Sequence, residues 1–148
     1  MTKAEFAWLV VAGVVICFFA GPVRADDRLW VSASLRAWHS DRNAGYNANT
    51  YGVGAEYERG SVSAALGEYH NSVRRTSVYG GFAWRPLRLG PVRAGVLGGA
   101  VSGYRPGVVW VALPVLSVEV GRIGVNVIVA PSTADSPGMA ALQVKWRL

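Results

Sequence analysis

The chain contains eight stretches in which apolar and polar residues alternate, and this pattern restricts the possible folds more than any other feature. The last stretch shows it most clearly, because Leu142, Val144, Trp146 and Leu148 fall on one side of an extended chain and polar residues on the other. The stretches cover residues 30–39, 50–58, 61–69, 77–84, 92–104, 109–120, 122–130 and 139–148. Most are rich in Val, Tyr, Trp, Gly and Ala and are bounded by Gly, Pro, Asn or Asp, which predicts β-strands.

The N-terminal segment indicates a membrane as the apolar environment. Lys3 precedes an apolar run over residues 6–20, followed by small residues up to Ala25, which is typical of an export signal cleaved before Asp26. The run is short for a spanning helix, which needs about 20 residues. We therefore expect residues 1–25 to be a signal peptide and residues 26–148 to be one domain; a retained membrane anchor is the alternative. The single cysteine, Cys17, lies in the signal, so no disulfide is expected.

The composition and net charge indicate which class of partner the protein binds. The formal net charge is +6, and +5 once the signal is removed, which favours a polyanionic partner. The sequence carries no nucleic-acid-binding signature, so we expect anionic lipid headgroups and no nucleic acid. Two histidines and scattered carboxylates show no metal-ligand spacing, and the glycine-rich segment 95–99 precedes no helix. We expect no metal and no cofactor.

Strands of about 9 to 11 residues match the length of a tilted membrane-spanning strand. A closed barrel satisfies all backbone hydrogen bonds inside lipid, so the predicted fold is all-β, an eight-stranded antiparallel transmembrane β-barrel. A cationic side chain facing mid-bilayer lipid costs about 2 to 4 kcal/mol. Charged strand residues should therefore face the lumen or lie near an interface, and these are Arg36, Glu56, Glu68, Arg93 and Lys145. Many strand glycines favour a lumen with room for one slender ligand.

Connection lengths predict the orientation. The turns at Gly60 and Gly121 are tight and residues 85–91 form a longer turn on the same side, whereas the connections on the other side are longer. Short turns are periplasmic in such barrels, so both termini are expected there. The opposite rim then collects the following side chains: His39, His70, Asn71, Ser72, Arg74, Arg75, Tyr104 and Arg105.

This rim could carry chemistry. His39 ends the first strand and Ser72 begins the second outer loop, so a base and a hydroxyl could meet there as acyl transfer requires. His70 competes as the base, and Arg74 and Arg75 could bind phosphate. The alternative is that all of these are ordinary solvated loop residues.

Four segments resemble the outer-membrane lipid A palmitoyltransferase family, PagP, across nearly the whole expected mature chain. The first is Trp38-His39 with the pairs Asp41-Arg42 and Tyr46-Asn47 after it. The second is Asn71-Ser72, where the family has Asp-Ser, and the third is the turn beginning at Trp84-Arg85. The fourth is Leu113-Pro114, followed by Ser117-Val118, Gly121 and Pro131, with the family's spacing between the two prolines.

The resemblance implies an enzyme of the bacterial outer membrane. It would move a palmitoyl-like acyl chain from a phospholipid to lipid A of lipopolysaccharide, as a membrane-embedded monomer. Its catalytic residues would be His39, Ser72 and Asn71, where Asn71 replaces an aspartate and can orient the histidine but cannot stabilise an imidazolium by charge. The substrate-binding residues would be Arg42, Arg74, Arg75 and Arg105.

The resemblance also implies a lateral gate at Pro114 and Pro131, because proline gives no N–H to the strand ladder. At the family's second opening this sequence has Ser34 and Thr50 instead of prolines. Asn71 and Ser34 favour an alternative function, a non-catalytic barrel that binds lipopolysaccharide as a structural or adhesion protein. A small pore would need a wet lumen, which eight strands rarely leave.

Overall fold

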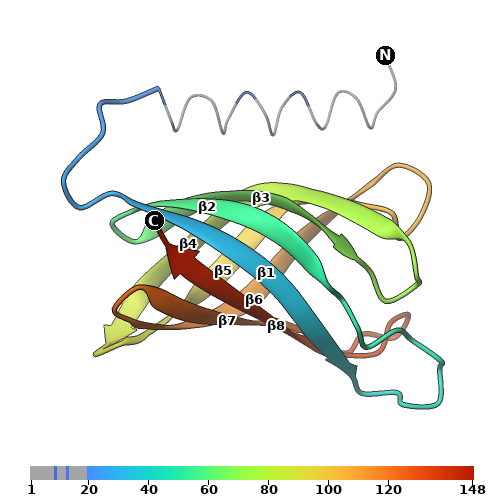
Figure 1. The fold of residues 1–148 in the computed structure, drawn as a ribbon. Coiled ribbons are helices and arrows are strands. Elements are labelled where there is room, and N and C mark those ends of the chain that lie inside the picture. The colour runs from blue at the N-terminus through green and yellow to red at the C-terminus, as the bar shows by residue number, and fades with distance from the viewer. Residues whose placement is uncertain (1–8, 10–12, 14–19) are drawn as a thin grey trace.

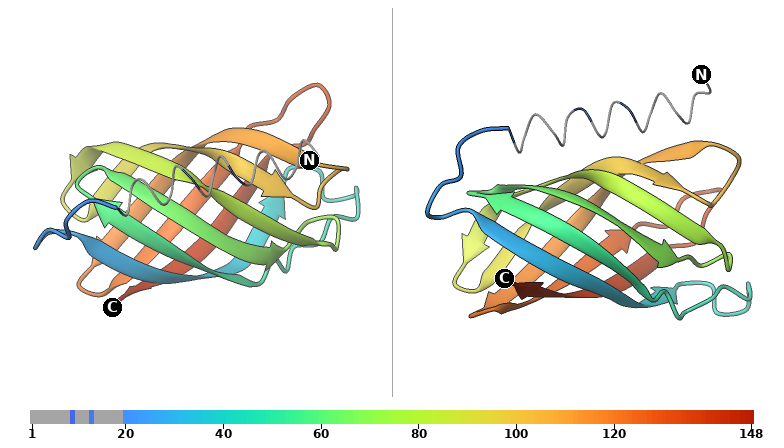
Figure 2. Two further views of the ribbon diagram at one scale, coloured as in Figure 1. Left: turned by 90° about the horizontal axis from the view of Figure 1, so that it is seen from above. Right: turned by 45° about the horizontal axis from the view of Figure 1, so that its top comes forward.

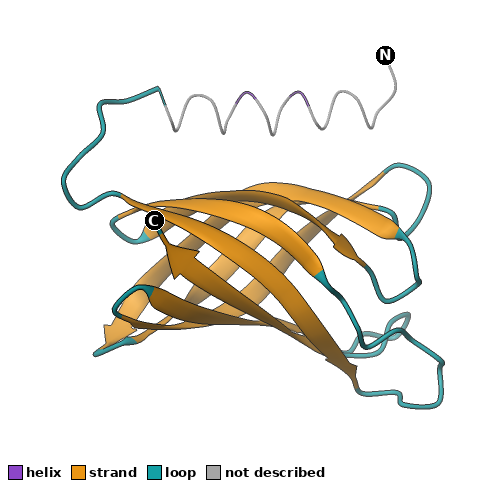
Figure 3. Ribbon diagram, viewed as in Figure 1, coloured by secondary structure: helices purple, strands orange, loops and turns teal. Residues whose placement is uncertain are grey.

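The computed structural model describes residues 9, 13 and 20–148, so most of the expected export signal, residues 1–25, lies outside the described residues. The strands are β1 (Arg28–His39), β2 (Gly52–Arg59), β3 (Val62–His70), β4 (Thr76–Leu89), β5 (Val92–Ser102), β6 (Val108–Val120), β7 (Ile123–Ala130) and β8 (Met139–Arg147). Each strand pairs antiparallel with the next, and β8 pairs with β1 (Figures 1 and 3). The predicted closed, eight-stranded barrel is confirmed. No helix among the described residues is long and apolar enough to cross a membrane.

The two ends of the barrel differ in their connections (Figure 2). At one end, the hairpins Gly60–Ser61, Gly90–Pro91 and Gly121–Arg122 have two residues each. Each begins with a glycine at positive φ, 61°, 58° and 61° respectively, as the first position of a type II′ turn requires. The strand termini at Arg28 and Arg147 lie at this tight-turn end, because Arg28 pairs with Glu58 beside the Gly60 turn and Arg147 pairs with Trp30 near the start of β1. The other end carries the long loops, 40–51, 71–75, 103–107 and 131–138.

The predicted long turn over residues 85–91 is wrong. These residues up to Leu89 belong to β4, and the register with β5 shifts between Trp84 and Leu87, which marks a β-bulge. Pro86 fits in the bulge because a bulge position needs no ladder N–H. Gly95 lies opposite on β5, where a Cβ would clash with the carbonyl oxygen of Trp84. Arg85 lies at the start of the bulge and points into the lumen, where it is 2% exposed.

The outer face of the barrel is an apolar band with indole rings towards both edges. Trp84 and Trp146 lie near the tight turns, because they pair with Val62 and Ile123 at strand ends, whereas Trp38 and Trp110 lie towards the long loops. The other exposed apolar residues of the strands include Leu29, Val31, Val53, Leu66, Leu116, Val118 and Val129. An apolar band between two aromatic girdles is the surface of a membrane-spanning barrel.

A network of charged side chains crosses the lumen in its tight-turn half. Its members are Arg28, Arg85, Arg93, Lys145, Glu56, Glu58 and Glu119. Lys145 Nζ lies 2.7 Å from Glu119 and 3.2 Å from Glu56, which also accepts a hydrogen bond from Arg85. The lumen positions predicted for Glu56, Arg93 and Lys145 are thus confirmed. Arg36 and Glu68 are exposed in the long-loop halves of their strands.

An ion pair anchors the segment before β1 to β2. The Asp27 carboxylate accepts hydrogen bonds from Arg59 Nε at 3.0 Å and Nη2 at 2.8 Å, and from the Tyr57 hydroxyl. The hydrogen bonds from Arg59 are the main cause that holds the pKa of Asp27 well below its ordinary value. A carboxyl whose pKa is lower in the folded state stabilises the fold above its unfolded pKa, and this stabilisation is lost as the pH falls.

We therefore expect the Asp27→Asn variant to be less stable than the wild type at pH 6, with the difference shrinking below about pH 4, the unfolded pKa of aspartate. Urea unfolding in detergent micelles, followed by tryptophan fluorescence at pH 6, 4 and 3, measures this. Glutamates elsewhere titrate in both proteins and cancel in the comparison. A difference independent of pH would contradict the role given to the ion pair.

Candidate active site

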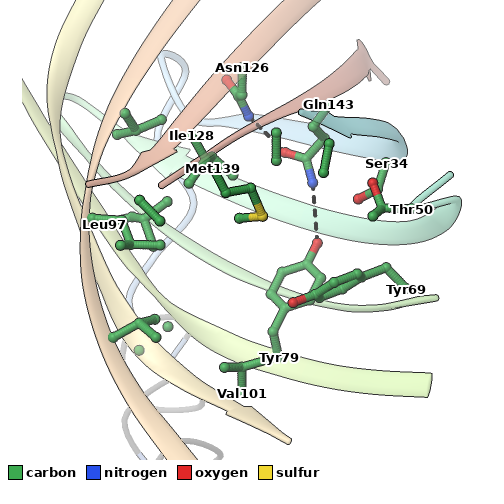
Figure 4. A pocket seen from close by; sticks show the side chains of 18 of the residues that line it. Ser34, Thr50, Tyr69, Tyr79, Leu97, Val101, Asn126, Ile128, Met139 and Gln143 are labelled. Atoms are coloured by element: carbon green, nitrogen blue, oxygen red, sulfur yellow. Dashed lines mark hydrogen bonds between the residues drawn. The ribbon is translucent and has the colours of Figure 1, made fainter. Parts of the chain in front are cut away.

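A cavity of about 720 Å³ occupies the lumen from the long loops down to Arg85 and Glu56 of the charged network. Its wall is mostly apolar or small, with Leu97, Val101, Ile128 and Met139 among the lining residues shown in Figure 4. The volume lies in the range of small-ligand pockets, about 300 to 1,000 Å³. The sequence-based expectation of space inside the barrel is therefore confirmed.

A row of polar side chains crosses the cavity (Figure 4). Gln143 Nε2 donates to the Tyr79 hydroxyl at 3.4 Å, and its Oε1 accepts from Asn126 Nδ2 at 2.8 Å. Ser117 continues the row: its hydroxyl donates to Asn126 Oδ1 at 2.7 Å and accepts from Arg85 at 2.8 Å. The apolar space nearest the long loops thus has a polar boundary on the side of the charged network.

His39 and Ser72 meet at the loop end of this cavity. His39 Nε2 lies 2.8 Å from Ser72 Oγ, which joins the end of β1 to the loop after β3. Ser72 is 4% exposed, and its Oγ also lies 3.9 Å from Met139 Sδ. The structure therefore brings together the two side chains that the sequence predicts as base and nucleophile, in hydrogen-bond geometry.

Asn71 does not lie against His39. Its Oδ1 accepts from the backbone N–H groups of Val73 at 3.0 Å and Arg75 at 2.9 Å. Its Nδ2 donates to Ser77 Oγ at 2.9 Å and to the Gly103 carbonyl at 3.2 Å. The hydrogen bonds of the Asn71 side chain within the described chain include none to the imidazole. Asn71 thus shapes the loop that presents Ser72, and the expectation that it orients the histidine directly is not met.

This geometry predicts that Asn71→Asp is harmful, although aspartate is what the resembled family carries. Aspartate has no side-chain N–H groups to replace the two that Asn71 Nδ2 donates, and its carboxylate would face the carbonyl oxygen of Gly103. We therefore expect a loss of about 1 to 3 kcal/mol in the free energy of unfolding. Equilibrium unfolding of the variant in micelles measures it, with the exposed loop substitution Asn43→Asp as control. Equal or greater stability of Asn71→Asp would show that the amide is not needed there.

The other predicted polar residues lie at the long-loop end of the barrel, where the cavity opens. Arg42, Arg74, Arg75 and Arg105 are exposed on three different loops, and Arg105 also lines the cavity. Arg74 has a positive φ of 61° and donates from Nη1 to the Gly45 carbonyl at 3.0 Å, which ties two loops together. The second candidate base, His70, stacks on Tyr51 with ring centroids 5.2 Å apart.

Two tyrosines at the mouth gained no catalytic role from sequence reasoning. The Tyr104 hydroxyl lies 2.9 Å from that of Tyr69, and burial raises the pKa of the Tyr104 phenol, which therefore stays protonated. The ring of Tyr46 stacks on His39 with centroids 4.8 Å apart and planes 20° from parallel. The Tyr46-Asn47 pair was noticed in the sequence as part of the family resemblance. The stack of its tyrosine on His39 could not be predicted, because a ring stack across a loop leaves no spacing pattern in a sequence.

The strand ladder has two interruptions in its long-loop half. Pairing of β6 with β7 stops at Val115–Ile128, so β6 from Val108 to Pro114 pairs with β5 alone, and Pro131 follows the end of β7. The two prolines predicted as a lateral gate thus flank a real gap in the ladder. Pairing of β1 with β2 stops at Ser34–Gly52, where no proline occurs and β1 has an irregularity against β8.

Two solved structures of designed transmembrane barrels support the fold. No protein-family model matches the chain, and no curated protein matches it. A structure from the de novo design of transmembrane β-barrels is 15% identical, covers 82% of this chain and 95% of its own, and has a TM-score of 0.61. The solution structure of the de novo designed TMB2.3 is 15% identical, covers 84% and 98%, and has a TM-score of 0.60. The Yersinia pestis outer membrane protein Ail is 14% identical over 83% and 100%, with a TM-score of 0.46.

Fold and site together define an eight-stranded transmembrane β-barrel with a histidine–serine pair at the mouth of an internal apolar cavity.

Proposed function

We propose that this barrel is an acyltransferase of the bacterial outer membrane, which moves a fatty acyl chain from a phospholipid to lipid A of lipopolysaccharide. The observation that carries the proposal is the 2.8 Å contact between His39 Nε2 and Ser72 Oγ at the mouth of a largely apolar cavity. A base and a hydroxyl supply acyl-transfer chemistry, and the cavity supplies a place for an acyl chain.

The donor phospholipid would reach the site sideways. The gap in the ladder between β6 and β7, beside Pro114 and Pro131, faces the membrane at the height of the cavity. An acyl tail that passes through this gap moves from the lipid bilayer to the apolar lining of the cavity around Leu113 and Ile128. Because both environments are apolar, the transfer costs little free energy. Its ester group would remain near the mouth, close to Ser72.

The proposed reaction has two steps. His39 takes the proton of Ser72 while Oγ bonds to the ester carbonyl carbon; the ester C–O bond breaks, and the proton passes to the departing lysophospholipid oxygen. In the second step, His39 takes the proton of an acceptor hydroxyl on lipid A while the hydroxyl oxygen bonds to the carbonyl carbon of the acyl-serine. The bond between that carbon and Ser72 Oγ breaks, and the proton passes from His39 to Oγ, so that the serine hydroxyl is restored and the acceptor carries the new ester. The protonated hydroxyl of Tyr104 can donate to the carbonyl oxygen as negative charge develops on it.

The acceptor would be held by charge. Arg42, Arg74, Arg75 and Arg105 are exposed on the loops at the long-loop end of the barrel, and guanidinium groups suit bidentate binding of the phosphates of lipid A. The proposed reaction needs neither a metal nor a cofactor. We propose that the barrel acts as a monomer.

A second candidate is a non-catalytic barrel that binds lipopolysaccharide through the same arginines. Two observations favour it: the Asn71 side chain is committed to its own loop, and no ion pair between His39 and a carboxylate occurs in the described residues. Both candidates use the rim, and they differ in whether Ser72 reacts.

The experiment that separates them uses the purified barrel in mixed micelles with phosphatidylethanolamine, labelled in its acyl chains, and lipid A. Acyl transfer predicts equal amounts of lysophospholipid and of lipid A with one added labelled chain. Binding of lipid A without any labelled product would favour the non-catalytic barrel and contradict the enzyme.

A further inference from the structure

We propose that Tyr46 is a positioning residue for His39, and that its ring performs the orienting role that a carboxylate has in other histidine–serine pairs. The inference rests on the proposed function, because it concerns the base of that reaction. Its basis is the near-parallel stack of the two rings, with centroids 4.8 Å apart and planes 20° from parallel.

His39 needs such a support. A general base must hold its nitrogen towards the proton that it removes, and in most sites a hydrogen bond to the second ring nitrogen fixes the ring. Among the described side chains, the hydrogen bond of the His39 imidazole is the one to Ser72, and it leaves the ring plane free to turn. A stacked aromatic ring fixes that plane, and it requires no charge.

Tyr46 is in turn fixed to the loop that carries Ser72. On one side of it, the backbone N–H of Asn47 donates to the Ser72 carbonyl at 2.9 Å, and Asn47 Nδ2 donates to the Asn71 carbonyl at 3.3 Å. On the other side, the Gly45 carbonyl accepts the hydrogen bond from Arg74. The residues before and after Tyr46 are therefore both tied to the 71–75 loop, so the base, the nucleophile and the stacked ring form one unit.

The stack also suits the charge that develops during the reaction. When His39 takes the Ser72 proton it becomes a cation, and the face of an aromatic ring attracts a cation. Tyr46 would thus stabilise the imidazolium more than the neutral imidazole. This interaction is weaker than that of a carboxylate, which makes a slow enzyme the natural outcome of the observed site.

The test compares Tyr46→Leu and Tyr46→Phe with the wild type, in acyl transfer and in NMR spectra of the barrel labelled at histidine. Leucine removes the stack, and we expect kcat to fall about tenfold, the upper value for an aromatic pair, with KM nearly unchanged. Phenylalanine keeps the ring and should keep kcat. In the spectra, the His39 ring signals should lose their ring-current shift in Tyr46→Leu and retain it in Tyr46→Phe.

A matched control is available in the same barrel. Tyr51 stacks on His70 with centroids 5.2 Å apart and planes 13° from parallel, so Tyr51→Leu should shift the His70 signals and leave kcat unchanged. Wild-type kcat in Tyr46→Leu, or His39 signals that do not move, would overturn the inference. If neither the wild type nor any variant transfers acyl chains but the His39 signals move as expected, the proposed function is wrong while the ring stack itself is confirmed. The positioning role is then wrong too, because there is no reaction for it to serve.

Discussion

Replacing His39 with alanine is expected to lower the rate of acyl transfer by at least about 100-fold, the contribution of a positioned general base. Without the imidazole 2.8 Å from Oγ, the Ser72 hydroxyl keeps its proton and is a poor nucleophile. Ser72→Ala removes the atom that receives the acyl chain, so transfer should fall to the background. Release of labelled lysophospholipid by the purified barrel measures both.

The matched control is His70→Ala, which removes the other histidine at the same rim. His70 stacks on Tyr51, and we expect this variant to keep the wild-type rate. Heat-modifiable migration on a gel verifies that each variant retains its barrel. Transfer by His39→Ala at the wild-type rate, or its loss in His70→Ala alone, would place the base elsewhere.

Replacing Glu56 with glutamine is expected to destabilise the barrel by about 3 to 5 kcal/mol, the cost of breaking a buried ion pair from one side. Glu56 is 5% exposed and pairs with both Arg85 and Lys145. The network already holds four cationic and three anionic side chains, so the substitution leaves two uncompensated positive charges in the lumen. Urea unfolding in micelles measures the loss.

Two further variants test whether the loss of stability comes from the ion pairs of Glu56. Glu68→Gln is the same chemical change at an exposed position of β3 and should stay within about 0.5 kcal/mol of the wild type. The double variant Glu56→Gln with Lys145→Met removes one charge of each sign and should recover part of the loss, since fewer buried cations remain unpaired. If Glu56→Gln were as stable as Glu68→Gln, the network would not be what holds this half of the lumen together.

Much of the barrel could be predicted from the sequence because alternation and turn residues are local signals. The expected ends of the strands, such as His39 and Ala130, agree with the structure within a few residues. The failure at residues 85–91 has a physical cause: a bulge adds a residue to one strand, which breaks the alternation without ending the strand. Pro86 and Gly90 then suggested a long turn where only Gly90–Pro91 turns.

Part of the candidate site could likewise be predicted from the sequence, and part could not. His39 and Ser72 were predictable because topology places their strand ends at one rim, and the rim is small. The direction of the Asn71 side chain was not, since it depends on which backbone groups of its own loop need partners. The stack of Tyr46 on His39 depends on the path of a 12-residue loop between β1 and β2, which no spacing rule determines.

We propose that the pair of Ser72 and His39 transfers an acyl chain to lipid A. The most direct measurement is the mass of lipid A from Gram-negative cells that make the wild-type chain, the Ser72→Ala variant at equal abundance in the outer membrane, or neither. We expect lipid A to be heavier by one acyl chain in cells that make the wild type, and in those cells alone. Lipid A of the same mass in all three, after treatment that brings phospholipids into the outer leaflet, would contradict it.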